Sequence, residues 1–150
     1  MFVSRHFQLE DFRCKGTDEP YPAEWIDERL VPLVAMLDDL RDAWGGPLVI
    51  VSGYRSAEYN AFLRSKSTGV AQNSQHIQGR AADVRPLDWT PGKVVNFCDL
   101  IDDLIQVGKL PALGGRGRYP AWAHVDTRPR PVDGHIARWN GSGFGSEPTA

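Results

Sequence analysis

Apolar residues recur at helical spacing in three stretches of the chain, and each stretch predicts a helix. The first helix covers much of 24–44 and ends at Gly45-Gly46, with Pro32 either kinking it or marking the first turn of its main segment. A short second helix covers 57–65. The third begins at Thr90-Pro91, a favourable N-cap and first turn, and carries the apolar positions Val94, Val95, Phe97, Cys98, Ile101, Leu104 and Ile105.

Four short segments predict strands between and after these helices, namely 48–51, 81–85, a strand and turn interrupted by glycine at 114–119, and 121–127. In the last strand Trp122, His124 and Asp126 share one face, because side chains alternate along a strand. The connections are too irregular for repeated βαβ units. We therefore expect an α+β domain with a small, mainly antiparallel sheet flanked by helices.

The bulk composition indicates one ordinary globular domain of 150 residues, with 41% hydrophobic and 24% charged residues. We expect residues 1–140 to form the domain and the Gly- and Ser-rich residues 141–150 to form a flexible tail. The net charge of −2 argues against a nucleic-acid partner, which requires a basic surface. No stretch approaches the ~18 apolar residues of a membrane helix, so no membrane partner is expected.

Two groups of residues leave alternatives open. Five arginines and no lysine lie between 116 and 138, which predicts either a rim that attracts an anionic polymer or a solvated face. Cys14 and Cys98 could form a disulfide, but free thiols are favoured, with Cys98 packed as a small apolar residue.

Two histidines and a carboxylate in the second half of the chain suit a metal ion. His76 and Asp83 lie close together in sequence, and His124 follows about forty residues later. Zn²⁺ favours imidazole nitrogen and carboxylate oxygen, and catalytic zinc sites typically have three protein ligands. Gly79 and the small Ala81-Ala82 pair would let the chain turn so that His76 and Asp83 face one point. We therefore predict that His76, Asp83 and His124 bind zinc.

The residues around this predicted site resemble a known family. The pattern Ser74-x-His76-x-x-Gly79-x-Ala81-x-Asp83, followed by His124-x-Asp126, is similar to the metal signature of the zinc D-Ala-D-Ala carboxypeptidase and peptidoglycan endopeptidase family. Val51-Ser52-Gly53-Tyr54-Arg55-Ser56 resembles that family's Ser-Gly-Tyr-Arg-Ser segment, and 7–14 resembles the start of its small phage-endolysin members. The likeness runs from about 7 to 139. It implies a Hedgehog/DD-peptidase-like fold and a zinc enzyme that cuts peptidoglycan stem peptides.

Arg55 is the main candidate for substrate binding, because it follows a strand at a turn that can project it over a cleft. Its guanidinium suits bidentate recognition of a carboxylate, and stem peptides carry carboxylates. In the resembling family the matching arginine is implied to bind substrate and to polarise the scissile carbonyl. The alternative is a structural arginine that ties the loop to the core through a salt bridge. Tyr54 is expected to line the cleft, and Ser74 to form hydrogen bonds within the metal loop.

The general base is where the chain departs from the family pattern. Many members have Glu or Asp three residues before the last histidine ligand, and this chain has Ala121 there. Asp126, the nearest acid in sequence, is either the base or a partner that holds His124, and the second role is narrowly favoured because metal-bound histidines usually have such a partner. Tyr119 is another candidate proton donor.

These features predict a monomeric zinc metallopeptidase of the peptidoglycan D,D-carboxypeptidase or L,D-endopeptidase type, with stem peptides as its substrate. The competing hypothesis, which Ala121 supports, is a non-catalytic, zinc-stabilised module that binds cell wall or forms part of a virion. No apolar run follows Met1, so we expect no signal peptide. The protein is then made in the cytoplasm and acts on the cell wall after release or delivery by other machinery.

Overall fold

The centre of the protein is a five-stranded sheet in the order β1-β2-β4-β3-β5, in a computed structural model that describes residues 2–67 and 69–141. The strands are β1 (Leu48–Ser52), β2 (Ala81–Pro86), β3 (Gly115–Arg118), β4 (Ala123–Asp126) and β5 (Ala137–Asn140). Neighbouring strands are antiparallel, except that β5 runs parallel to β3. The prediction of an α+β domain with a small, mainly antiparallel sheet is confirmed.

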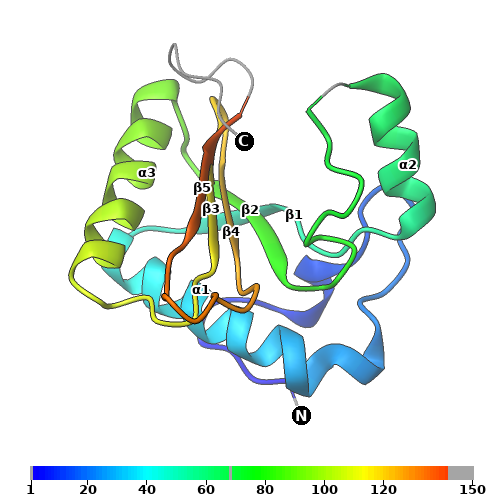
Figure 1. Cartoon of the computed structure of the whole chain (residues 1–150), viewed down its shortest axis with the longest axis horizontal. Helices are drawn as coiled ribbons and strands as arrows, with labels where there is room; N and C mark the ends of the chain where they lie inside the picture. Colours follow the sequence, from blue (N-terminus) through cyan, green and yellow to red (C-terminus); the bar gives the residue numbers. More distant parts are fainter. Residues whose placement is uncertain (1, 68, 142–150) are drawn as a thin grey trace.

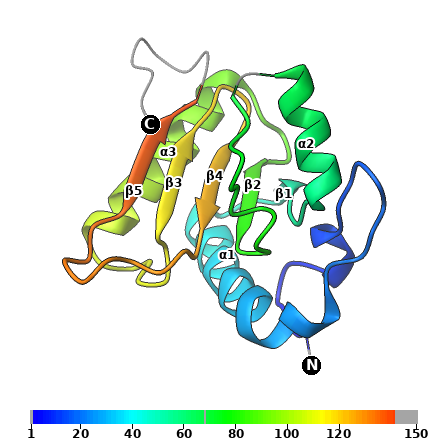
Figure 2. The same cartoon turned by 45° about the vertical axis from the view of Figure 1, so that its right-hand side comes forward.

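Three α-helices flank the sheet: α1 (Val31–Trp44), α2 (Ala57–Lys66) and α3 (Pro91–Gln106). Figure 1 shows α3 and α2 on opposite sides of the strands, and Figure 2 shows the strands side by side in front of α3. The α3 helix begins as predicted, because the Thr90 side chain accepts a hydrogen bond from the Lys93 N–H and Pro91 occupies the first turn. Among the described residues, no helix combines the length and apolar character needed to span a bilayer.

The predicted helix over 24–44 is present in three parts. A 3-10 turn (Ala23–Trp25) leads into a π-helical turn (Ile26–Leu30), which leads into α1. Pro32 lies in the first turn of α1, directly after the π-helical turn, so it marks the start of the main segment. The helix ends at Gly45, whose φ of 81° lies in the left-handed region and whose N–H donates to the Arg41 carbonyl.

The hydrophobic core lies between one face of the sheet and the helices α1 and α3. Its fully or almost fully buried members include Leu33, Leu37, Leu40, Ala82, Val84, Phe97, Ile101, Ala123 and Val125. Cys98 is buried among them as predicted, and both cysteines are free thiols. Since Ala82, Val84, Ala123 and Val125 face this core, the residues between them in β2 and β4 face the opposite side.

Two features of the structure do not follow from the sequence. The sequence does not predict β5, because its four residues, Ala-Arg-Trp-Asn, have no apolar run and only partial burial. The arginines between 116 and 138 do not share one environment, since Arg116 is buried whereas Arg130 and Arg138 are exposed. Arg116 and Arg118 pair with Asp102 of α3, Arg128 pairs with Asp126, and Arg130 donates to the Leu110 and Leu113 carbonyls. Residues 142–150, which hold most of the predicted flexible tail, lie outside the described residues.

Candidate metal centre

The predicted site lies in one transverse row of the sheet. In strand order β1-β2-β4-β3-β5, the register partners are Ser52, Asp83, His124, Gly117 and Trp139. Directly opposed residues in neighbouring strands have their side chains on the same face. The row therefore places Asp83, His124 and Trp139 together on the face that points away from the core.

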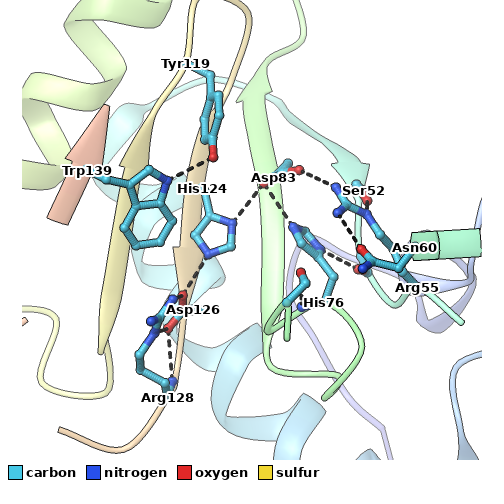
Figure 3. Close-up of polar contacts among 12 residues, drawn as sticks. Ser52, Arg55, Asn60, His76, Asp83, Tyr119, His124, Asp126, Arg128 and Trp139 are labelled. Atoms are coloured by element: carbon cyan, nitrogen blue, oxygen red, sulfur yellow. Dashed lines mark hydrogen bonds and ion pairs between the residues drawn. The ribbon is translucent and has the colours of Figure 1, made fainter. Parts of the chain in front are cut away.

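His76 reaches this row from the loop before β2 and completes a cluster of three buried side chains. Its Nε2 lies 3.2 Å from Asp83 Oδ1, and His124 Nδ1 lies 3.2 Å from the same oxygen. One potential ligand atom from each residue lies within 4.8 Å of the others. Figure 3 shows both imidazole rings pointing toward the Asp83 carboxylate. The structure thus brings together the three residues for which the sequence predicts zinc binding.

Hydrogen bonds on the far side of each ring determine which nitrogen faces Asp83 with a lone pair. His76 Nδ1 lies 2.7 Å from the Gly53 carbonyl oxygen, which can only accept, so Nδ1 carries the proton. His124 Nε2 lies 2.7 Å from Asp126 Oδ2 and donates to it. In the neutral rings, His76 Nε2 and His124 Nδ1 therefore direct lone pairs toward a carboxylate oxygen. Such an arrangement favours the binding of a cation between the two nitrogens and the oxygen.

Two separations in this cluster, from a nitrogen of each histidine to Asp83 Oδ1, are those expected between ligands of a zinc ion. Two ligands at ~2.0–2.1 Å from a tetrahedral zinc lie about 3.3 Å from each other. Each histidine nitrogen lies 3.2 Å from Asp83 Oδ1, which is close to that value. Two imidazoles and one carboxylate are a common donor set of catalytic zinc sites, which keep a further position for water or substrate.

Burial and charge set the protonation of the three groups. Burial lowers the pKa of His76 and keeps its imidazole neutral at neutral pH. Burial opposes ionisation of Asp83, but His76 and His124 outweigh it and hold its pKa well below the usual range. Burial likewise disfavours the charged form of His124, but its hydrogen bonds to Asp126 and Asp83 raise its pKa. A proton therefore competes with a metal ion at His124 more than at His76.

Asp126 is fully buried behind His124, on the side away from Asp83. Arg128 donates to it three times, from Nε to Oδ1 at 2.9 Å, from Nη2 to Oδ2 at 2.7 Å and from its backbone N–H to Oδ1 at 3.1 Å. Although burial raises the pKa of Asp126, Arg128 and His124 together hold it below the usual range. Both carboxylate oxygens are engaged, which suits a group that orients His124.

Arg55 joins the strand β1, the helix α2 and the metal cluster. Its guanidinium donates to Ser52 Oγ at 3.2 Å, to Asn60 Oδ1 at 3.4 Å and to Asp83 Oδ2 at 3.3 Å. The salt bridge to Asp83 agrees with the alternative that Arg55 has a structural role and ties its loop to the core. A guanidinium has five N–H groups, however, and these contacts use three of them. Nη1 and Nη2 therefore each retain an N–H that these contacts do not use.

The remaining candidates make contacts of their own. Ser74 is buried, and its Oγ accepts from the His76 N–H at 3.1 Å, inside the loop that carries the histidine. The half-buried Tyr54 ring packs edge-on against Tyr21 and Trp25. The Tyr119 hydroxyl accepts from Trp139 Nε1 at 2.9 Å. Ala121 lies in the turn between β3 and β4, so the acid of the family pattern has no counterpart there.

Several residues of the site were missed from the sequence. Trp139 packs against the His124 ring at 4.9 Å between centroids, and Arg128 holds Asp126. No sequence signal marks Trp139, because β5 itself has none. The Gly-Arg-Gly-Arg sequence of β3 does carry a signal, since side chains alternate in a strand. The two glycines, Gly115 and Gly117, face the site, and the two arginines face α3.

Comparisons with known proteins give one family. Residues 5–126 match the family model described as Peptidase M15. The protein named "Probable peptidoglycan L,D-endopeptidase MepK" of Haemophilus influenzae is 36% identical over 94 residues, which cover 61% of this chain and 42% of that protein. "Peptidoglycan L,D-endopeptidase MepK" of Escherichia coli K12 is 33% identical over 85 residues, covering 55% and 41%. The chain thus spans less than half the length of these relatives. No solved structure gives a significant match.

Proposed function

Because the chain belongs to the peptidase M15 family, we propose that it is a zinc-dependent peptidase that hydrolyses peptide bonds in peptidoglycan stem peptides. The convergence of His76, Asp83 and His124 carries this proposal, since two imidazole lone pairs face one buried carboxylate oxygen. The names of the two relatives favour cleavage within the stem peptide over removal of its last residue.

In this proposal the two oxygens of Asp83 have different tasks. Oδ1 faces the two histidine nitrogens and would be the metal ligand, while Oδ2 binds Arg55 at 3.3 Å. A zinc ion held by these residues supplies Lewis-acid chemistry that polarises a carbonyl and activates water. Arg55 is only partly exposed, with 15% of its side chain accessible, and its unused N–H groups bind a carbonyl or carboxylate of the stem peptide.

We assign a positioning role to Asp126 instead of the role of general base. Its carboxylate is fully buried, contacts the His124 nitrogen that faces away from Asp83, and is held by Arg128. Such a partner fixes the orientation and tautomer of a metal-binding histidine. Delivery of the protein to the cell wall by release or by other machinery, and its likeness to phage endolysins, stay predictions.

The test combines metal analysis with wall digestion. Elemental analysis of purified protein should give about one zinc ion per chain. Zinc-loaded protein should release peptide fragments from purified peptidoglycan, chelator should stop the release, and added zinc should restore it. Mass analysis of the fragments distinguishes an L,D-endopeptidase from a D,D-carboxypeptidase by which bond is lost. Fully zinc-loaded protein that releases nothing from any tested wall would overturn the proposal and favour a wall-binding module.

A further inference from the structure

The indole of Trp139 contacts both His124 of the metal cluster and Tyr119. Its ring centroid is 4.9 Å from that of His124, and the Arg128 guanidinium lies 5.3 Å from its centre. Its Nε1 donates a hydrogen bond of 2.9 Å to the Tyr119 hydroxyl. Figure 3 shows the tyrosine hydroxyl pointing toward the space beside His124 and Asp83. Trp139 therefore links His124, a predicted metal ligand, to the phenol of Tyr119, which is not one of the predicted metal ligands.

Two glycines make this arrangement possible. Trp139 lies on β5 and His124 on β4, with β3 between the two strands. At the usual strand spacing, β4 and β5 are then about 9–10 Å apart. The intervening register position is Gly117, where an added Cβ would lie 2.6 Å from Trp139 Nε1. An added Cβ at Gly141 would overlap the Tyr119 ring. Both aromatic rings thus occupy positions that any other residue at 117 or 141 would block.

The chemistry of this hydrogen bond leaves the tyrosine proton available for another acceptor. An indole N–H can only donate, so the Tyr119 oxygen accepts and its own proton is not used in the bond. Within the described part of the chain, no acceptor for that proton is present. Burial raises the pKa of Tyr119, so the hydroxyl stays protonated at neutral pH. Its hydrogen bond with Trp139, whose ring lies against His124, places the hydroxyl beside the cluster.

We propose that Trp139 is a positioning residue that directs the Tyr119 O–H into the metal centre, where Tyr119 donates a hydrogen bond to the carbonyl oxygen of the scissile peptide. The inference rests on the proposed peptidase function. The carbonyl oxygen gains negative charge as water adds to the peptide carbon, and removing one donor held in place for such an oxygen typically costs about 10²–10³-fold in kcat. The vacant acid position at Ala121 leaves this role open to another side chain.

A double-mutant cycle tests the link between the two residues. Tyr119→Phe removes the donor, and Trp139→Phe keeps a ring against His124 but removes the N–H. We expect kcat to fall about 100-fold for Tyr119→Phe and about 10-fold for Trp139→Phe, with KM nearly unchanged. In the Tyr119→Phe background, Trp139→Phe should have no further effect. The matched control is Trp122→Phe, since Trp122 also stacks on Tyr119 but its Nε1 has no hydrogen-bond partner among the described residues.

Two measurements other than turnover accompany the cycle. Zinc affinity should be equal in all variants, and affinity for a phosphinate analogue of the cleaved bond should fall in the same non-additive pattern. The inference would be overturned if the reductions in kcat of the two single variants multiply in the double variant. It would also be overturned if zinc binding weakens in Trp139→Phe. Wild-type turnover in Trp139→Phe would overturn it as well, and in that case the proposed function would stand. Wild-type protein that neither binds zinc nor cleaves the wall would instead refute the proposed function.

Discussion

The Asp126 carboxylate contacts His124 at Nε2, 2.7 Å away, while the opposite ring nitrogen of His124 faces Asp83. The two acids therefore act on one imidazole from its two sides. Arg128 fixes Asp126 through three hydrogen bonds, so the orientation of His124 depends on a chain of contacts that begins at Arg128.

Asp126→Asn should weaken zinc binding by about 10–100-fold, because the imidazole loses the charged acceptor that orients it. Competition with a chromophoric chelator measures the affinity. Turnover should recover largely at saturating zinc. The control is Asp133→Asn, the same change beside the exposed His135. Full zinc occupancy with no turnover would instead identify Asp126 as the general base.

Arg55→Ala should reduce kcat/KM by about 10–100-fold, since a hydrogen bond to a charged group contributes about 1.5–3 kcal/mol. The ion pair with Asp83 predicts a smaller loss of zinc affinity as well. Arg55→Lys should recover little activity, because a single ammonium cannot contact Ser52, Asn60 and Asp83 together. Arg64→Ala, on the exposed face of α2, is the control. Unchanged turnover in Arg55→Ala would restrict Arg55 to a structural role.

Gly117→Ala should displace the Trp139 indole, because the new Cβ would lie 2.6 Å from its Nε1. We expect a loss of about 1–3 kcal/mol in the free energy of unfolding, the usual cost of overpacking, and a change in tryptophan fluorescence. Urea unfolding followed by circular dichroism measures the first. Gly69→Ala provides the comparison, since an added Cβ there meets no atom within 4 Å. Equal stability of the two variants would contradict the close packing around Gly117.

Alkaline pH should destabilise the protein through Cys98. Burial raises the pKa of this thiol to about 11, whereas an unfolded thiol ionises near about 8.5. The folded state binds its proton more tightly, so the contribution of Cys98 to stability is complete below about pH 8 and is lost as pH rises through 11.

The measurement is the free energy of unfolding at about pH 8 and about pH 10.5. Wild type should lose about 2 kcal/mol more than Cys98→Ala over this interval. Cys14→Ala is the control, because the effect of burial on Cys14 is outweighed by its hydrogen bonds with Thr17 and Ser56, which lower its pKa. Identical alkaline losses in wild type and Cys98→Ala would contradict the prediction.

The parts of the fold that could be predicted from the sequence are those that local patterns determine. Thr90 and Pro91 mark the start of α3, and the apolar positions of that helix follow its period. Ala82 and Val84 alternate with Asp83, so the face of β2 that carries the acid follows from the strand period alone. His76, Asp83 and His124 could be named together because their residue types suit one ion.

The parts of the fold and of the site that could not be predicted from the sequence depend on pairing between distant segments. β5 is stabilised by its register with β3, and nothing in its four residues distinguishes it from a loop. The partners of Arg116 lie on α3, so its role was not visible from the neighbouring arginines. Which nitrogen of His76 faces the metal centre depends on the Gly53 carbonyl, a backbone group that carries no sequence signal.

The transverse row across the sheet also bears on how the chain reaches its native state. Asp83 and His124 are neighbours only when β2 and β4 pair in the correct register. A shift of one residue in β4 would bring Val125 beside Asp83 and turn the imidazole toward the core. Mispaired molecules therefore lack the three-ligand set, and an ion that binds only the native pairing stabilises it by mass action. Zinc present during refolding should thus select molecules whose strands are correctly paired, before any substrate is met.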